Sequence, residues 1–162
     1  MHSIDNLVTI YKEKIYRTCY YFSGTDEDAK DLCQEIFMII IEKLPTFQNR
    51  SSIGTWIYRI SINTCLIYKR KKRYHINIDD TYLGDLAEDN SIIAIKKLEE
   101  EQFKLLHEKI SLLPLLDKLI SILYLQDCSY EEISQIAGIS ISNVGVRINR
   151  IKSKIRIQVN KI

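Results

Sequence analysis

Residues 129–156 read SYEEISQIAGISISNVGVRINRIKSKIR, and this stretch decides the fold. It opens with a capping box, because Ser129 is followed three residues later by Glu132, a spacing that satisfies the free N–H groups at a helix start. Gly138 then ends a short helix. Apolar residues return at helical intervals after that glycine, at Val144, Ile148, Ile151 and Ile155. A short helix, a glycine turn and a second helix with an apolar inner face predict a helix-turn-helix.

The polar face of the second helix predicts contact with DNA. One residue before each apolar position, and at the same spacing, stand Asn143, Arg147, Arg150 and Lys154. Residues 140–162 contain six basic side chains and no acidic one. Arg and Asn read base edges in the major groove, and Lys and Arg hold phosphates. Gly145 interrupts this helix, either to let the helix approach the DNA backbone or because a glycine is tolerated there at about 1 kcal/mol.

The rest of the chain also predicts helices. Apolar residues recur at helical spacing from Ile4 to Phe22, from Leu32 to Leu44, and from Thr55 to about Arg73. Residues 75–90 lose this periodicity and carry five acids without any Lys or Arg, which is typical of a linker. We therefore expect an all-α fold of two small helical domains, residues 1–75 and 96–162, joined by an acidic linker at 76–95.

Length and charge narrow the function classes. A chain of 162 residues is too short for a barrel enzyme or a two-lobed α/β catalyst. The net charge of +2 is unevenly distributed along the chain: it is +4 in residues 1–75, −5 in 76–110 and +3 in 111–162. This distribution suits two basic modules that bind a polyanion, joined by an acidic segment that does not bind one. No uncharged apolar run is long enough to span a membrane, and no secretory signal is recognisable at the start.

The cysteines do not indicate a metal site. Cys19, Cys33, Cys65 and Cys128 form no C-x-x-C pair, and no His stands at ligand spacing from them. We expect four reduced thiols packed as small core residues of a cytoplasmic protein, with no metal and no cofactor.

The amino-terminal half combines an acidic helix face with an aromatic and basic helix. Asp28, Asp31 and Glu35 share one face, but no His or Lys partner in a nearby loop supports acid–base catalysis, which leaves a solvated or protein-docking face. The third predicted helix mixes aromatic, amide and basic side chains suited to unpaired bases and phosphates, at Trp56, Tyr58, Arg59 and Asn63 and in the run Lys69 to Arg73. For Trp56 itself we favour a core position over a nucleic-acid contact, whereas for the basic run we favour nucleic acid.

Three groups of motifs together resemble the extracytoplasmic-function (ECF) sigma factors of bacterial RNA polymerase, in the sigma-70 family. Residues 28–37 (DAKDLCQEIF) are similar to sigma region 2.2, and residues 55–63 (TWIYRISIN) to regions 2.3–2.4. Three further stretches are similar to sigma region 4: Leu113-Pro114, residues 129–133 (SYEEI) and residues 143–150 (NVGVRINR). The resemblance implies a promoter-specificity factor, without enzymatic activity of its own, that works with core RNA polymerase in the cytoplasm.

The resemblance also implies a role for each surface. Docking on the clamp helices of the polymerase β′ subunit is implied for Asp31, Leu32, Gln34, Glu35 and Phe37. Recognition and melting of the promoter −10 element is implied for Trp56, Tyr58, Arg59, Asn63, Lys69, Arg70 and Arg73. Reading of the −35 element is implied for Ser142, Asn143, Arg147, Arg150 and Lys154, on a domain that also packs on the β flap. The acidic linker would run toward the RNA channel, and an anti-sigma factor is an expected partner.

Some positions depart from the family pattern. The family often has an acid where Ile67 stands, a Thr at Asn143 and a basic residue at Gly145, so the promoter sequence does not carry over. Two other hypotheses stay open at this point. A stand-alone helix-turn-helix regulator explains residues 129–156 but leaves the Trp56–Arg73 segment without a task, and a small enzyme or thiol-based metal sensor would use the cysteines and carboxylates.

Overall fold

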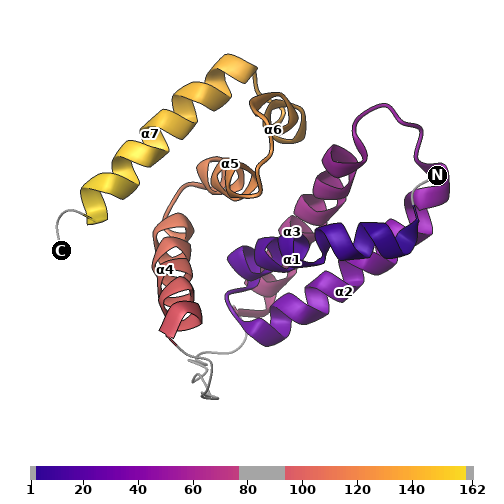
Figure 1. Cartoon of the computed structure of the whole chain (residues 1–162), viewed down its shortest axis with the longest axis horizontal. Helices are drawn as coiled ribbons and strands as arrows, with labels where there is room; N and C mark the ends of the chain where they lie inside the picture. Colours follow the sequence, from indigo (N-terminus) through magenta and orange to yellow (C-terminus); the bar gives the residue numbers. More distant parts are fainter. Residues whose placement is uncertain (1–2, 77–93, 160–162) are drawn as a thin grey trace.

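The computed structural model describes residues 3–76 and 94–159, and all regular elements in these ranges are helices. Figure 1 shows their order along the chain. The helices are α1 (Ile4–Ser23), α2 (Asp26–Lys43), a 3-10 turn (Leu44–Thr46), α3 (Ile53–Ile76), α4 (Ala94–Ser111), α5 (Leu115–Leu125), α6 (Tyr130–Ala137) and α7 (Ile141–Val159). The predicted all-α fold is confirmed. Most of the predicted linker lies outside the described residues, although Ile76 still belongs to α3 and residues 94–95 already belong to α4.

The helices α1, α2 and α3 form the first bundle (Figure 1). Gly24 ends α1 in the left-handed conformation, with φ of 81°, and Thr25 starts α2 by accepting a hydrogen bond from the Asp28 N–H at 3.2 Å. One isoleucine from each helix is fully buried between them, at Ile15, Ile36 and Ile57. These turns and caps were readable in the sequence because each depends on residues only a few positions apart.

The helices α5, α6 and α7 form the second bundle, and α4 leads into it. The capping box at the start of α6 is present, because Ser129 accepts from the Glu132 N–H while Glu132 accepts from the Ser129 N–H. Gly138 ends α6 in the left-handed conformation, with φ of 70°. The predicted apolar seam of α7 is buried at Val144, Ile148 and Ile151 and half-buried at Ile155. The helix-turn-helix prediction is therefore confirmed.

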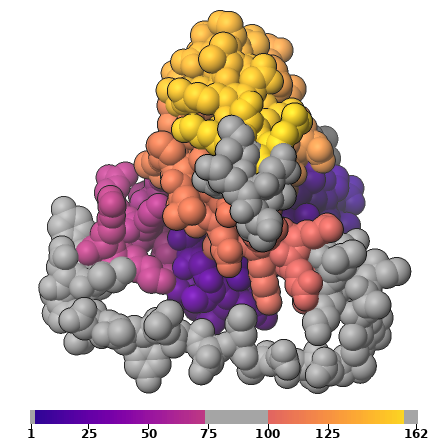
Figure 2. Space-filling model, turned by 90° about the vertical axis from the view of Figure 1, so that its left-hand side faces the viewer, coloured from indigo at the N-terminus to yellow at the C-terminus, as the bar shows by residue number. Residues whose placement is uncertain are grey.

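The two bundles pack against each other. Phe103 of α4 contacts Tyr20 and Tyr21 of α1, with ring centroids 5.7 and 5.6 Å apart. The ammonium of Lys118, on α5, lies 5.5 Å from the ring centroid of Phe22. Figure 2 shows the orange residues of the second bundle against the indigo and purple residues of the first. Within residues 3–76 and 94–159, no helix is both long enough and apolar enough to cross a membrane.

Candidate nucleic-acid and polymerase interfaces

One face of α7 presents the amide and basic side chains that the sequence placed there. Ser142, Asn143, Arg150 and Lys154 are exposed, and Arg147 is half-buried. The hydroxyl of Ser140 accepts a hydrogen bond from the Asn143 N–H at 3.2 Å and so caps the helix. This cap was not predicted from the sequence, although a Ser directly before an apolar helical run is a usual start signal. The cap fixes where α7 begins and thus which residues its first turn exposes.

Arg147 and Arg150 share an acidic partner on another helix. Asp117, in the first turn of α5, is 1% exposed. The Arg147 guanidinium donates to its carboxylate at 2.6 Å, and the Arg150 guanidinium donates at 3.1 Å. Arg147 keeps 26% of its side chain exposed, whereas Arg150 keeps 51%. The two arginines, which the sequence treated alike, therefore differ in how much of each remains available to DNA.

Gly145 lies beside Tyr130 of α6. A Cβ built on this glycine would lie 3.5 Å from the nearest ring carbon of Tyr130, which is an ordinary van der Waals distance. Gly145 therefore faces a neighbouring helix, and the space beside it is sufficient for a methyl group. Among the described residues, no neighbour within the protein requires a glycine at this position.

The aromatic part of α3 is largely covered. Trp56 is half-buried and packs on Phe47, with ring centroids 5.1 Å apart. Tyr58 is only 4% exposed, and burial raises its pKa. Arg59 is exposed but donates to the backbone carbonyl of Gln135, on α6, at 3.1 Å. Asn63 is exposed. The implied role of Tyr58 in contacting DNA is thus not available in this arrangement, because the ring lies inside the protein.

The contacts that cover this part of α3 come from the other bundle. Glu132, the capping residue of α6, accepts hydrogen bonds from the hydroxyls of Ser52 at 3.3 Å and Thr55 at 3.5 Å. The coulombic effect of Glu132 contributes to raising the pKa of Tyr58, after burial and the nearby Cys128 and Tyr11. The first helix of the helix-turn-helix therefore sits on the start of the helix implied in −10 recognition.

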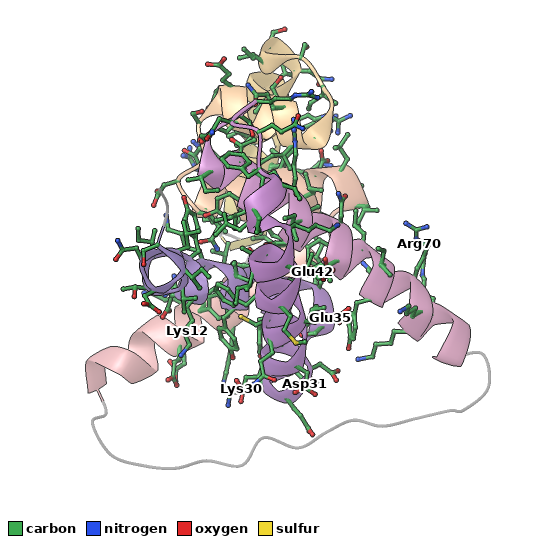
Figure 3. All side chains as sticks on the ribbon, turned by 90° about the vertical axis from the view of Figure 1, so that its right-hand side faces the viewer. Lys12, Lys30, Asp31, Glu35, Glu42 and Arg70 are labelled. Carbon is green, nitrogen blue, oxygen red and sulfur yellow. The ribbon has the colours of Figure 1, made fainter. Side chains whose placement is uncertain are left out.

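The basic run at the end of α3 remains mostly free for a polyanion. Arg70 and Arg73 are exposed and Lys69 is half-buried, while Figure 3 shows Arg70 projecting from α3. Lys72 instead pairs with Asp28 of α2, Nζ to Oδ2, at 2.9 Å. The hydrogen bond from Lys72 holds the pKa of Asp28 below its usual value. Asp28 therefore ties α2 to α3 and does not belong to the open acidic face that its spacing suggested.

An acidic face with an apolar centre runs along α2. Asp31, Gln34 and Glu35 are exposed, and Figure 3 shows Asp31, Glu35 and Glu42 following the helix. Met38 is 71% exposed on the same face, three residues after Glu35. Met38 was not among the docking residues expected from the sequence, although its spacing from Asp31 and Glu35 puts all three on one helical face.

Two residues of the implied docking set are turned inward. Leu32 is 2% exposed in the core, so its assignment to the docking surface is corrected: it holds α2 in place and does not face a partner. Phe37 is half-buried against the same core. The alternation of buried and exposed positions follows from the helical period, which brings residues 32 and 36 to the core and 31, 34, 35 and 38 to the surface.

All four cysteines are reduced and buried. Cys33 interacts with Cys19, and this contact together with burial raises the pKa of the Cys33 thiol. Burial, followed by the nearby Glu132, raises the pKa of Cys128 to about 12. A thiol with a raised pKa is a poor nucleophile and a poor metal ligand. Within the part of the chain that the structure describes, no group of three or more His, Cys, Asp or Glu side chains is arranged to hold a metal ion.

Comparison with known proteins identifies the family. The model of Sigma-70 region 2 matches residues 7–75, and the model of Sigma-70 region 4 matches residues 94–155. The chain is 30% identical to the ECF RNA polymerase sigma factor SigW of Bacillus subtilis, in an alignment covering 97% of this chain and 89% of SigW. This chain belongs to the ECF sigma factors. The bundle α1–α3 is its region 2, and the bundle α5–α7, with α4, is its region 4.

Two further similarities agree with that membership. The sigma factor is 30% identical to the RNA polymerase sigma factor SigV of Bacillus subtilis, covering 95% of this chain and 89% of SigV. Its fold is similar to that of the sigma factor RpoE from Bartonella quintana, solved in complex with the anti-sigma factor NepR. The TM-score is 0.76 at 18% identity, covering 96% of this chain and 95% of RpoE.

Proposed function

We propose that this sigma factor gives core RNA polymerase its promoter specificity by reading two promoter elements with two separate surfaces. The observation that carries the proposal is the succession of a region 2 and a region 4 in one chain, with exposed amide and basic side chains along α7. A stand-alone helix-turn-helix regulator accounts for region 4 alone and leaves region 2 unexplained. The protein acts by binding and not by catalysis.

Region 2 docks on the polymerase through the acidic face of α2. Asp31, Gln34 and Glu35 supply the polar contacts, and Met38 supplies an apolar centre. Such a face suits a basic helical partner with an apolar seam, because opposite charges steer the approach and apolar contact stabilises the complex. We assign the β′ clamp helices as this partner and the β flap as the partner of region 4.

The −10 element is captured by α3. Arg70 and Arg73, with Lys69, hold the phosphates, while Asn63 and Trp56 meet the separated bases. Tyr58 and Arg59 join them only after region 4 moves away, because Tyr58 is buried and Arg59 is bonded to α6. Stacking and phosphate contacts of this kind offset the free energy of melting a few base pairs.

The −35 element is read by exposed residues along α7, namely Ser142, Asn143, Arg150 and Lys154. The acidic linker at 76–95 runs toward the RNA channel, a proposal that concerns residues mostly outside the described ranges. An anti-sigma factor keeps the protein inactive, a partner suggested by the complex in which the similar RpoE fold was solved. Because its polymerase partner is cytoplasmic, we place the protein in the cytoplasm.

Run-off transcription tests the proposal. Core polymerase is incubated with genomic promoter fragments, with and without this protein, and we expect discrete transcripts only when the protein is added. A gel shift without polymerase separates the two classes of DNA-binding protein. Tight, sequence-specific binding of duplex DNA by the free protein, together with no effect on transcription by core polymerase, would establish a stand-alone regulator instead.

A further inference from the structure

Asp117 is a buried acid on α5, a helix whose other buried residues are apolar apart from Lys118 and Ser121. Its neighbours on α5 include the buried Leu119, Ile120, Ile122 and Leu123, and Asp117 itself is 1% exposed. A carboxylate in such surroundings destabilises the fold unless cations and hydrogen bonds satisfy it. Its presence therefore calls for a partner, and both partners come from α7.

The partners are two arginines one turn apart on α7. Arg147 donates from Nη1 to Oδ1 of Asp117 at 2.6 Å. Arg150 donates from Nη2 to Oδ2 at 3.1 Å and to Oδ1 at 3.4 Å. Two guanidinium groups thus share one carboxylate, and the cluster retains one positive charge.

The two arginines use this carboxylate differently. The Nε atom of Arg147 is buried and, within residues 3–76 and 94–159, has no hydrogen-bond partner, so this side chain is largely enclosed. Arg150 gives only Nη2 to Asp117 and keeps half of its side chain in solvent. Because the guanidinium is planar, holding one nitrogen restricts the orientation of the remaining N–H donors.

We propose that Asp117 is a positioning residue for −35 recognition, which orients the Arg150 guanidinium while Arg147 neutralises the buried carboxylate. This inference rests on the proposed function, because it takes α7 to be the −35 reader. Bidentate recognition of a base depends on the orientation of the guanidinium fork, so an Arg150 that is free to rotate discriminates less between bases. Asp117 itself does not touch DNA.

The test compares base preference rather than total activity. Holoenzyme formed from core polymerase and the full-length sigma factor transcribes a template pool that is randomised across the −10 and −35 elements, and the transcripts are sequenced. The variant is Asp117→Asn, which keeps the shape of the side chain and removes its charge. The matched control is Asp127→Asn, the same substitution at an exposed position whose left-handed φ of 61° an Asn also adopts.

We expect Asp117→Asn to reduce discrimination at one or two −35 positions by about tenfold, which lies within the range of a lost bidentate contact. Discrimination at the −10 positions should stay at the wild-type level, and Asp127→Asn should match wild type at both elements. A purely structural role for Asp117 would lower output from all templates alike. Unchanged −35 preference in Asp117→Asn therefore overturns the inference, whatever the total output.

A second variant covers the case in which Asp117→Asn does not fold, as judged by its helical circular dichroism. The double substitution Asp117→Leu with Arg147→Leu replaces the buried ion pair by apolar side chains, which cores often accept, and leaves Arg150 unheld. It should lose discrimination at the same −35 positions at which Arg150→Ala loses it, and wild-type preference at those positions overturns the inference. If the wild-type holoenzyme itself shows a −10 but no −35 preference, or gives no transcripts, the proposed function fails and the inference with it.

Discussion

Arg147 and Arg150 lie one turn apart on α7, yet their surroundings give them different roles, one in stability and one in DNA contact. Arg147 is enclosed beside a buried carboxylate, and Arg150 is half in solvent. The periodicity of the sequence put both on one face, which is correct. It did not reveal the difference, because the difference comes from Asp117, thirty residues earlier in the chain.

This difference predicts separate effects of two alanine substitutions. Arg147→Ala should lower the free energy of unfolding by about 1–3 kcal/mol, because it removes a charged hydrogen bond to a buried carboxylate. Arg150→Ala should lower stability less than Arg147→Ala, because its bonds to Asp117 are longer and more exposed, and it should reduce −35-dependent transcription without impairing binding to core polymerase. Urea denaturation followed by circular dichroism measures the first effect, and run-off transcription with a pull-down measures the second. Equal loss of core binding in both variants would contradict these assignments.

Gly145 offers a substitution that should stabilise the protein. A methyl group there would meet the Tyr130 ring at 3.5 Å, without a clash, and alanine favours a helix interior over glycine by about 1 kcal/mol. Gly145→Ala should therefore raise the midpoint of urea denaturation while transcription stays at the wild-type level. A stabilised variant with reduced −35-dependent transcription would show instead that the DNA approaches α7 at this position.

At the scale of single helices, α2 illustrates how one element serves two purposes. Its buried side holds region 2 together through Leu32 and Ile36, and its exposed side presents Glu35 and Met38. A change on the exposed side should therefore affect partner binding and leave the fold intact.

Reversal of one charge on α2 tests this separation. Glu35→Arg should abolish binding of core polymerase in a pull-down, because an acidic docking face would gain a cation, while the circular dichroism spectrum stays unchanged. Glu101→Arg, the same reversal at an exposed position of α4, serves as the control and should bind as wild type. If the Glu35→Arg variant binds core polymerase as well as wild type does, the assignment of α2 to the docking surface is wrong.

The helices themselves were predictable, because their signals are local. Thr25, the Ser129–Glu132 box and Gly138 act on residues within one turn, and the apolar seam of α7 follows from the helical period. The cover over Tyr58 was not predictable, since periodicity assigns a residue to a face but does not say what packs on that face. Leu32 was misassigned for a related reason: the motif it belongs to mixes core and surface positions.

At the scale of the whole molecule, the packing of region 4 on region 2 encloses an unpaired charge. Lys118 is 5% exposed over the Phe22 ring, and among the described residues it makes no ion pair. Burial, followed by the nearby Lys69, lowers the pKa of Lys118 from 10.5 to about 8. Because Phe22 belongs to region 2, separation of the two regions returns the ammonium to water.

Packing of the two regions should depend on pH, because the pKa of Lys118 is lower in the packed form than in the separated form. Between pH 8 and 10.5 the separated form binds more protons than the packed form, so packing strengthens as pH rises through this window and is constant below it. Small-angle X-ray scattering should show a smaller radius of gyration at pH 10 than at pH 7.5.

Lys118→Met tests the same charge at constant pH. Methionine fills the apolar space of the lysine stem without a charge, so this variant should be compact at pH 7.5 and lose the pH dependence. Lys12→Met, at an exposed position of α1, is the control and should behave as wild type. A Lys118→Met variant with the wild-type pH response would show that another group controls the packing.

The side chain of Glu132 has two roles, because it caps α6 and also contacts region 2. One carboxylate oxygen completes the cap of α6, and the other accepts hydrogen bonds from Ser52 and Thr55 of region 2. When the regions part, the cap stays intact and water replaces the two hydroxyl donors, so region 4 can leave without any helix unwinding. A substitution of Glu132 therefore affects two things at once, the start of α6 and the contact between the two regions.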